Sequence, residues 1–200
     1  MILSHKYKFI FIKTTKTAGT SLEVALSRYC GKDDIITPIL PPVELHEPRN
    51  DSGFYNHIGA SEIKSKVHPD VWKNYFKFTF ERNPYDKMVS WYWWIKHQHH
   101  INENFKEFCL KCEDGIYDLP TDFEKYSIDE KIVVDFIGKY ESLSVDFENV
   151  CKDLNIPFDG NITKEKAYSR QNNNHHSIYY DNETKKIIEK HFWRELKLFY

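Results

Sequence analysis

The chain has 200 residues, of which 40% are hydrophobic and 29% are charged, so its composition is that of a globular protein and excludes a largely disordered chain. Its 28 basic and 30 acidic residues give a formal net charge of −2, so we expect no nucleic-acid partner, and an anionic ligand needs a local basic site. No apolar run approaches the roughly 20 residues of a membrane span, no secretory segment is present, and four cysteines make no disulfide framework, which together predict a cytoplasmic protein.

The first predicted elements are a strand and the helix that follows it. Phe9–Ile12 is a short run of aromatic and β-branched residues, which is typical of an interior strand. Apolar residues then recur at helical spacing from Leu22 to Tyr29, so the hydrophobic period changes between the two segments. The residues between them therefore form a loop at the N-terminus of a helix.

That loop has the composition of an anion-binding site, with Lys16, Thr17, Ala18, Gly19, Thr20 and Ser21 in succession. Free backbone amides and the positive end of the helix dipole suit a phosphate or sulfate. Gly19 lets the backbone approach the anion, and Lys16 adds a full charge. An ordinary strand-to-helix turn with a capping hydroxyl is the alternative. The nucleotide-kinase pattern GxxxxGK[ST] is absent, because here the lysine precedes the glycine.

The order Lys-Thr-Ala-Gly-Thr-Ser resembles the 5′-phosphosulfate loop of sulfotransferases that use 3′-phosphoadenylyl sulfate (PAPS). It is most similar to the carbohydrate (family 2 type) branch, which often carries Pro-Lys-Thr-Gly-Gly-Thr-Ser. Thr15 stands where that branch has proline, and Ala18 where it has the first glycine. The resemblance implies that residues 16–21 bind the donor and that Lys16 is also catalytic, on the side of the leaving group.

A long connection and a short helix are predicted next. Gly31–Gly53 is rich in proline and polar residues, so we expect a binding loop or a lid. His57 follows, and Ser61 is the expected N-cap of a short helix over Glu62–Val67.

A second change from strand to helix follows. Phe76–Glu81 alternates apolar and polar residues as a strand does. Asn83 as N-cap and Pro84 at the first helical position predict a helix start. Arg82 therefore lies at the carboxyl end of a strand, where open α/β sheets bind their ligands.

The sequence from Phe78 to Tyr92 resembles the 3′-phosphate motif of sulfotransferases. That motif is an apolar strand, then Arg-Asp/Asn-Pro, then a serine eight residues after the arginine. Arg82 and Ser90 match the arginine and the serine. The resemblance implies that both bind the 3′-phosphate of PAPS, and a guanidinium suits phosphate oxygens.

A metal site is an alternative for the segment that contains His97, His99, His100, Cys109 and Cys112. Histidine and cysteine are zinc ligands, but a single CxxC lacks the second pair of a zinc finger. The segment is expected to be helical and solvated, so no metal ligand is predicted.

The rest of the chain predicts one more strand and two more helices. The strand is expected over Lys131–Tyr140 and the helices over Leu143–Leu154 and Asp181–Tyr200, with a polar loop at Arg170–His176. No repeat or linker is present, so residues 1–200 are expected to form one sulfotransferase domain. The predicted fold is a single α/β domain with a P-loop-like parallel sheet of about four or five strands flanked by helices.

The resemblance implies transfer of a sulfuryl group from PAPS to an acceptor hydroxyl or amine on a carbohydrate, by in-line displacement. Adenosine 3′,5′-bisphosphate is then the product, and no metal takes part. One alternative is a P-loop kinase, which would need Mg²⁺ held by a Ser/Thr and a strand-end Asp. The other is a non-catalytic nucleotide- or glycan-binding relative. These motifs leave the oligomeric state and the exact acceptor open.

His57 is the expected catalytic base among ten histidines. An alcohol is a poor nucleophile at neutral pH, and histidine is the side chain best suited to take its proton there. In some carbohydrate sulfotransferases a histidine between the two phosphate motifs has this role, whereas others use glutamate. Glu62 and Glu44 are therefore the alternatives, and His57 could instead only pack against the loop.

Overall fold

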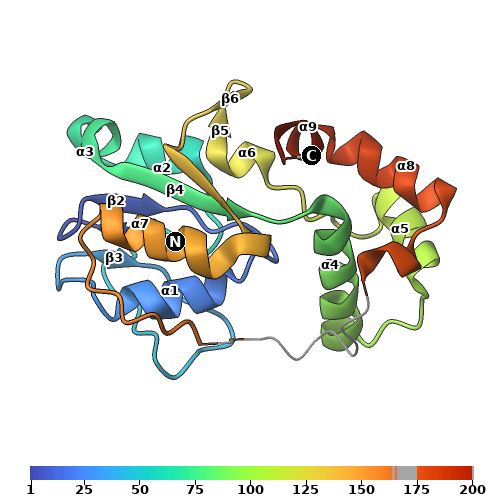
Figure 1. The fold of residues 1–200 in the computed structure, drawn as a ribbon, viewed down its shortest axis with the longest axis horizontal. Coiled ribbons are helices and arrows are strands. Elements are labelled where there is room, and N and C mark those ends of the chain that lie inside the picture. The colour runs from blue at the N-terminus through green and yellow to red at the C-terminus, as the bar shows by residue number, and fades with distance from the viewer. Residues whose placement is uncertain (164, 166–174, 200) are drawn as a thin grey trace. The chain divides into compact units, whose positions relative to one another are not determined.

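The structure is a computed structural model that describes residues 1–163, 165 and 175–199, and they form two compact units (Figure 1). The first unit contains Met1–Glu81 and Glu124–Glu165, and the second contains Arg82–Phe123 and residues 175–199. The expectation of one domain over residues 1–200 stays a prediction.

A five-stranded sheet is the centre of the first unit, with the strand order β3-β1-β2-β4-β7. The strands are β1 (Ile2–Ser4), β2 (Phe9–Phe11), β3 (Ile35–Ile36), β4 (Phe76–Glu81) and β7 (Phe136–Lys139). Since β2, β4 and β7 are parallel, their carboxyl ends meet at one edge of the sheet. The predicted α/β fold with its flanked sheet is confirmed.

The direction of β1 corrects the expectation of a wholly parallel sheet. β1 was not predicted, and it pairs antiparallel with both β2 and β3. Four residues connect Ser4 to Phe9, and a parallel crossover needs about a dozen or more. The chain can therefore only turn back on itself between these two strands.

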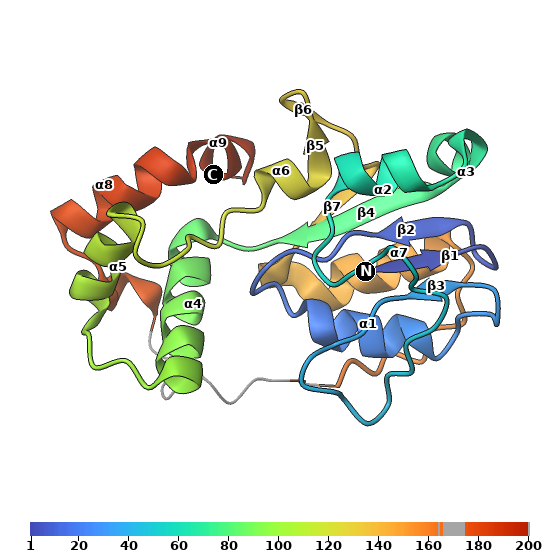
Figure 2. The ribbon, with the colours of Figure 1, turned by 180° about the vertical axis from the view of Figure 1, so that it is seen from behind.

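Helices cover both faces of the sheet, as Figures 1 and 2 show. Side chains alternate along a strand, so Phe9 and Phe11 pack with α1 (Gly19–Ser27) and α7 (Leu143–Asp153). Ile10 and Ile12 face the other way and pack with α2 (Ala60–Lys66) and α3 (Pro69–Asn74). The short helix η1 (Tyr140–Ser142) leads into α7.

The second unit is helical in the part of the chain that the structure describes. Its helices are α4 (Pro84–His99), α5 (Phe105–Glu113), η3 (His176–Tyr179), α8 (Asn182–His191) and α9 (Trp193–Phe199). The predicted start of α4 is confirmed, since the Asn83 side chain accepts hydrogen bonds from the backbone amides of Tyr85 and Asp86. From Glu124 the chain belongs to the first unit again, where the helix α6 (Phe123–Tyr126) leads into a hairpin of β5 (Ser127–Ile128) and β6 (Lys131–Ile132).

Four predicted element boundaries need correction. The terminal helix is broken at Phe192 into α8 and α9, and α2 begins at Ala60 after the N-cap Gly59 rather than at Ser61. The strand expected over Lys131–Tyr140 is reduced to β6 and β7, and the long loop contains β3. Residues 170–174 of the predicted loop and residue 200 of the predicted terminal helix lie outside the described residues.

The Cys109 segment is helical as predicted, but the expectation that it is solvated is wrong for its cysteines. Cys109 and Cys112 are buried in the core of the second unit, among Phe108, Ile188 and Phe192. Among the described residues, no helix has both the length and the apolar character that crossing a membrane requires.

Candidate active site

The predicted phosphate loop lies at the carboxyl end of β2 and leads into α1. Two hydroxyl groups bind this connection to the neighbouring strand β4. Thr14 Oγ1 donates to the carbonyl oxygen of Phe80, and Thr79 Oγ1 donates to the carbonyl oxygen of Ile12 at 2.7 Å. The loop is therefore held at the edge where parallel strands end, which is the ligand-binding edge of such sheets.

The N-terminus of α1 has the backbone geometry of an anion site. Its N-cap is Ala18, which supplies no side-chain cap to the amides of the first turn. Lys16 and Ala18 both have φ values of 60°, in the left-handed region that favours glycine. Left-handed backbone in non-glycine residues concentrates at ligand sites, where the surrounding structure holds it in place.

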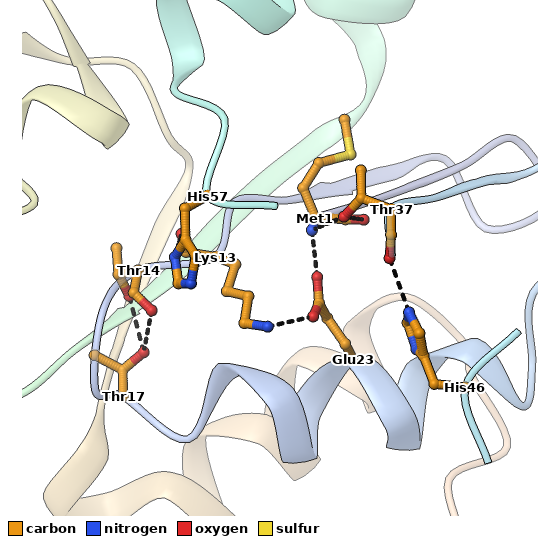
Figure 3. Close-up of polar contacts among 8 residues, drawn as sticks. All are labelled: Met1, Lys13, Thr14, Thr17, Glu23, Thr37, His46 and His57. Atoms are coloured by element: carbon orange, nitrogen blue, oxygen red, sulfur yellow. Dashed lines mark hydrogen bonds and ion pairs between the residues drawn. The ribbon is translucent and has the colours of Figure 1, made fainter. Parts of the chain in front are cut away.

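The hydroxyl groups of the loop differ in burial and in their hydrogen-bond partners. Thr17 is buried, and its Oγ1 lies 2.9 Å from Thr14 Oγ1. This side chain therefore forms a hydrogen bond within the connection and stabilises its conformation (Figure 3). Ser21 is also buried, and its Oγ accepts a hydrogen bond from the Glu165 amide at 3.0 Å. Thr20 is half-buried at the start of α1.

His57 lies against the same connection. Its Nδ1 is 3.1 Å from the carbonyl oxygen of Lys13, three residues before Lys16. Figure 3 shows the imidazole next to Lys13. A carbonyl oxygen only accepts, so Nδ1 carries the proton of the neutral imidazole and Nε2 is the basic nitrogen. The φ of His57 is 62°, so this residue also has left-handed backbone, as Lys16 and Ala18 do. The structure thus places His57 on Lys13, in the connection that leads from β2 to residues 16–21 within the first unit.

Arg82 and Ser90 both belong to the second unit. Both Nε and Nη2 of Arg82 donate to Asp86 Oδ2, at 2.8 and 2.6 Å. Asp86 and Ser90 are four residues apart on α4, so they share one face of this helix with the guanidinium. A guanidinium has five N–H donors, and Asp86 accepts two of them. His176 Nδ1 lies 4.0 Å from Asp86 Oδ1.

The comparison with known families decides the class of protein. A model of the sulfotransferase family matches residues 1–200, the whole chain.

The chain belongs to the sulfotransferase family.

It is an enzyme of that class, which confirms the resemblance found in its motifs. An uncharacterized protein of Archaeoglobus fulgidus is 36% identical over 99 residues, which are 48% of this chain and 80% of that protein. A crystal structure of a sulfotransferase from Alicyclobacillus acidocaldarius is similar over 92% of this chain and 90% of its own, with 15% identity and a TM-score of 0.45.

The two glutamates that compete with His57 are placed less well for a base in this sulfotransferase. Glu62 accepts one hydrogen bond from the Tyr55 hydroxyl, and that bond lowers the pKa of the Glu62 carboxyl, which weakens it as a base. Glu44 lines a cavity of about 360 Å³ with Arg28, at the C-terminal end of α1. The predicted phosphate loop is at the opposite end of that helix.

Two lysines near the loop, Lys125 and Lys13, were not predicted from the sequence. Lys125 Nζ donates to Thr15 Oγ1 at 3.0 Å, and its backbone lies against Gly59, two residues after His57. No sequence signal reveals this contact, because 110 residues separate the partners. Lys13 could have been noticed, since it is a charged residue directly after a buried strand.

The cysteines of α5 are buried, which makes them unfavourable as metal ligands. Burial raises the pKa of the Cys112 thiol to about 12 and raises that of Cys109 as well, which disfavours the thiolate form that binds metal. Within residues 1–163, 165 and 175–199, no group of three or more His, Cys, Asp or Glu side chains is arranged to hold a metal ion.

Proposed function

We propose that this sulfotransferase transfers the sulfuryl group of PAPS to a hydroxyl or amino group of a saccharide. The observation that carries the proposal is the loop from Lys16 to Ser21, which joins the uncapped amides of α1 to a lysine. The imidazole of His57 contacts the carbonyl of Lys13, three residues before this loop. The order of residues in this loop, which resembles that of the carbohydrate branch, supports a saccharide acceptor. The low cysteine content supports the cytoplasm as its compartment.

On the donor side, the amides of Gly19, Thr20 and Ser21 bind the 5′-phosphosulfate together with Lys16. Negative charge grows on the bridging oxygen as its bond to sulfur breaks, and the Lys16 ammonium stabilises that charge. Such an interaction is stronger in the transition state than in the ground state, so it raises turnover. Arg82 and Ser90 bind the 3′-phosphate and hold the donor in place.

On the acceptor side, His57 Nε2 accepts the proton of the acceptor hydroxyl while the acceptor oxygen forms its bond to sulfur. The bond between sulfur and the bridging oxygen breaks on the opposite side. The products are the sulfated acceptor and adenosine 3′,5′-bisphosphate. The bond from Nδ1 to the Lys13 carbonyl keeps Nε2 as the basic nitrogen throughout.

Thermal unfolding with added ligands separates this proposal from its alternatives. Adenosine 3′,5′-bisphosphate at 100 times its Kd should raise the Tm by about 5–10 °C without Mg²⁺. Stabilisation by ATP only with Mg²⁺ would favour a kinase instead. Labelled PAPS with a panel of saccharides then tests turnover, and stabilisation without any transfer would favour a non-catalytic binding protein.

Arg82→Ala should weaken binding of adenosine 3′,5′-bisphosphate about 10- to 100-fold, because a charge-assisted contact contributes roughly 1.5–3 kcal/mol. Affinity for adenosine 5′-monophosphate, which lacks the 3′-phosphate, should change little. Isothermal titration of both ligands measures the two effects.

Two further variants control for charge and for the partner of Arg82. Arg28→Ala removes an exposed arginine at the far end of α1 and should leave both affinities unchanged. Arg82→Ala with Asp86→Asn also removes the carboxylate that would otherwise stay beside the phosphate. Equal losses for both ligands would mean that Arg82 only supports the fold.

Turnover should be independent of added metal, because the proposed reaction uses only the charges of Lys16, Arg82 and the loop amides. Treatment with EDTA followed by gel filtration should leave the rate of sulfuryl transfer unchanged. A loss of activity that zinc or magnesium restores would contradict this prediction and favour metal-dependent chemistry.

A further inference from the structure

A buried ion pair lies directly behind the phosphate loop. The Lys13 ammonium is 2.6 Å from Glu23 Oε2, and both side chains are almost completely buried (Figure 3). Burial alone raises the pKa of the Glu23 carboxyl, but the amino groups of Met1 and Lys13 outweigh that effect and hold the pKa below its ordinary value. Glu23 is therefore an anion at neutral pH.

The stem of Lys13 determines how closely the loop can approach the sheet. A methyl group added at Gly19 would lie 2.6 Å from Lys13 Cγ and 3.1 Å from Cε, so the glycine backbone rests on this stem. Real Cβ atoms do not approach that closely, which explains the requirement for glycine here. The ion pair fixes the far end of the stem, since Glu23 is on the second turn of α1.

The backbone of the same lysine contacts the proposed base. The Lys13 carbonyl accepts the hydrogen bond from His57 Nδ1 and so selects the tautomer with a basic Nε2. Lys13 thus lies close to Gly19 through its side chain and contacts the His57 imidazole through its carbonyl.

We infer that the Lys13–Glu23 pair is a positioning element that fixes the phosphate loop and the His57 imidazole in position relative to each other. This inference rests on the proposed function, in which residues 16–21 hold the donor and His57 takes the acceptor proton. Burying two charges costs desolvation free energy, and apolar residues of similar volume often stabilise the folded protein equally well. An apolar side chain, however, has no charged end to anchor its stem beneath Gly19.

The test compares Lys13→Met, Glu23→Gln and the double variant. Each single change leaves an altered charge balance in the core and should lower the Tm. The double variant removes both charges of the pair, and it also removes the carboxylate that contacts the buried Met1 amino group. Because burial already lowers the pKa of that amino group, it can lose its proton in the double variant, and stability should recover in part toward that of the wild-type protein. Its turnover should nevertheless stay at least tenfold below the wild-type value, with a smaller change in KM.

A spectroscopic measurement separates positioning from mere stability. Nitrogen-15 NMR of labelled histidine, with His57→Ala used to assign the signals, should give a protonated Nδ1 and a basic Nε2 for His57 in the wild-type protein. In the double variant the signals should move toward a mixture of tautomers. The pair Lys87–Asp122, which is equally buried in the second unit, is the control, and Lys87→Met with Asp122→Asn should leave the His57 signals unchanged.

Wild-type turnover together with unchanged His57 signals in the double variant would overturn the inference. Failure of the proposed activity is a different result, seen as wild-type protein that transfers no sulfuryl group. Even then, if the pair positions the imidazole, the His57 signals should still change in the Lys13 and Glu23 variants.

Discussion

His57→Ala is expected to lower turnover by roughly 10²–10⁴-fold, which is the usual contribution of a general base. Affinity for adenosine 3′,5′-bisphosphate should stay within a few-fold, because the proposed donor contacts come from residues 16–21, Arg82 and Ser90. Single-turnover rates with labelled PAPS and titration of the bisphosphate measure these two quantities separately.

The pH profile gives a second test of the same residue. A base must be deprotonated to act, and histidine ordinarily titrates near neutral pH, so wild-type turnover should rise with pH across that range. The rise should vanish in His57→Ala. Glu62→Gln is the matched control, and near-normal turnover in His57→Ala with a collapse in Glu62→Gln would give the role of base to the carboxylate.

Lys16→Ala is expected to lower turnover by about 10²–10³-fold, the range found when one donor to a developing negative charge is removed. Binding of adenosine 3′,5′-bisphosphate should weaken much less, because the amides of the loop remain and the ammonium contributes most as the bridging bond breaks. Turnover at saturating donor and the Kd of the bisphosphate are the measurements.

A lysine outside the loop provides the control for this change. Lys32→Ala removes an exposed lysine from the connection between α1 and β3 and should alter neither quantity. Turnover of Lys16→Ala within a few-fold of the wild-type value would mean that Lys16 belongs to the loop without a part in the chemistry. Equal losses in turnover and affinity would assign it to ground-state binding alone.

The sequence by itself determined the features that depend on neighbouring residues. The strand Phe76–Glu81 was predicted with its correct bounds, because alternation of apolar and polar residues is a local property. The cap at Asn83 and the first helical position of Pro84 were likewise predicted, since capping acts within one turn. Lys16–Ser21 was recognised for the same reason, as a short motif between a strand and a helix.

Only the tertiary structure decided which distant residues meet. The contacts of Lys13 with Glu23 and His57 join residues 10 and 44 positions apart, and no periodicity in the sequence encodes such a pairing. Lys125 reaches Thr15 because packing of the α6 segment brings it there. The sequence could only rank ten histidines by context, whereas the structure places the His57 imidazole on the Lys13 carbonyl, three residues before the loop.

The direction of β1 and the burial of Cys109 also required the folded chain. β1 and β3 have only three and two residues, too few for a periodic pattern, so their pairing with neighbours defines them. Cys109 lies on a short helix whose exposed and buried faces are decided by α8 packing against it. Local sequence specifies which elements form, while the burial of apolar surface between them decides which faces and side chains come together.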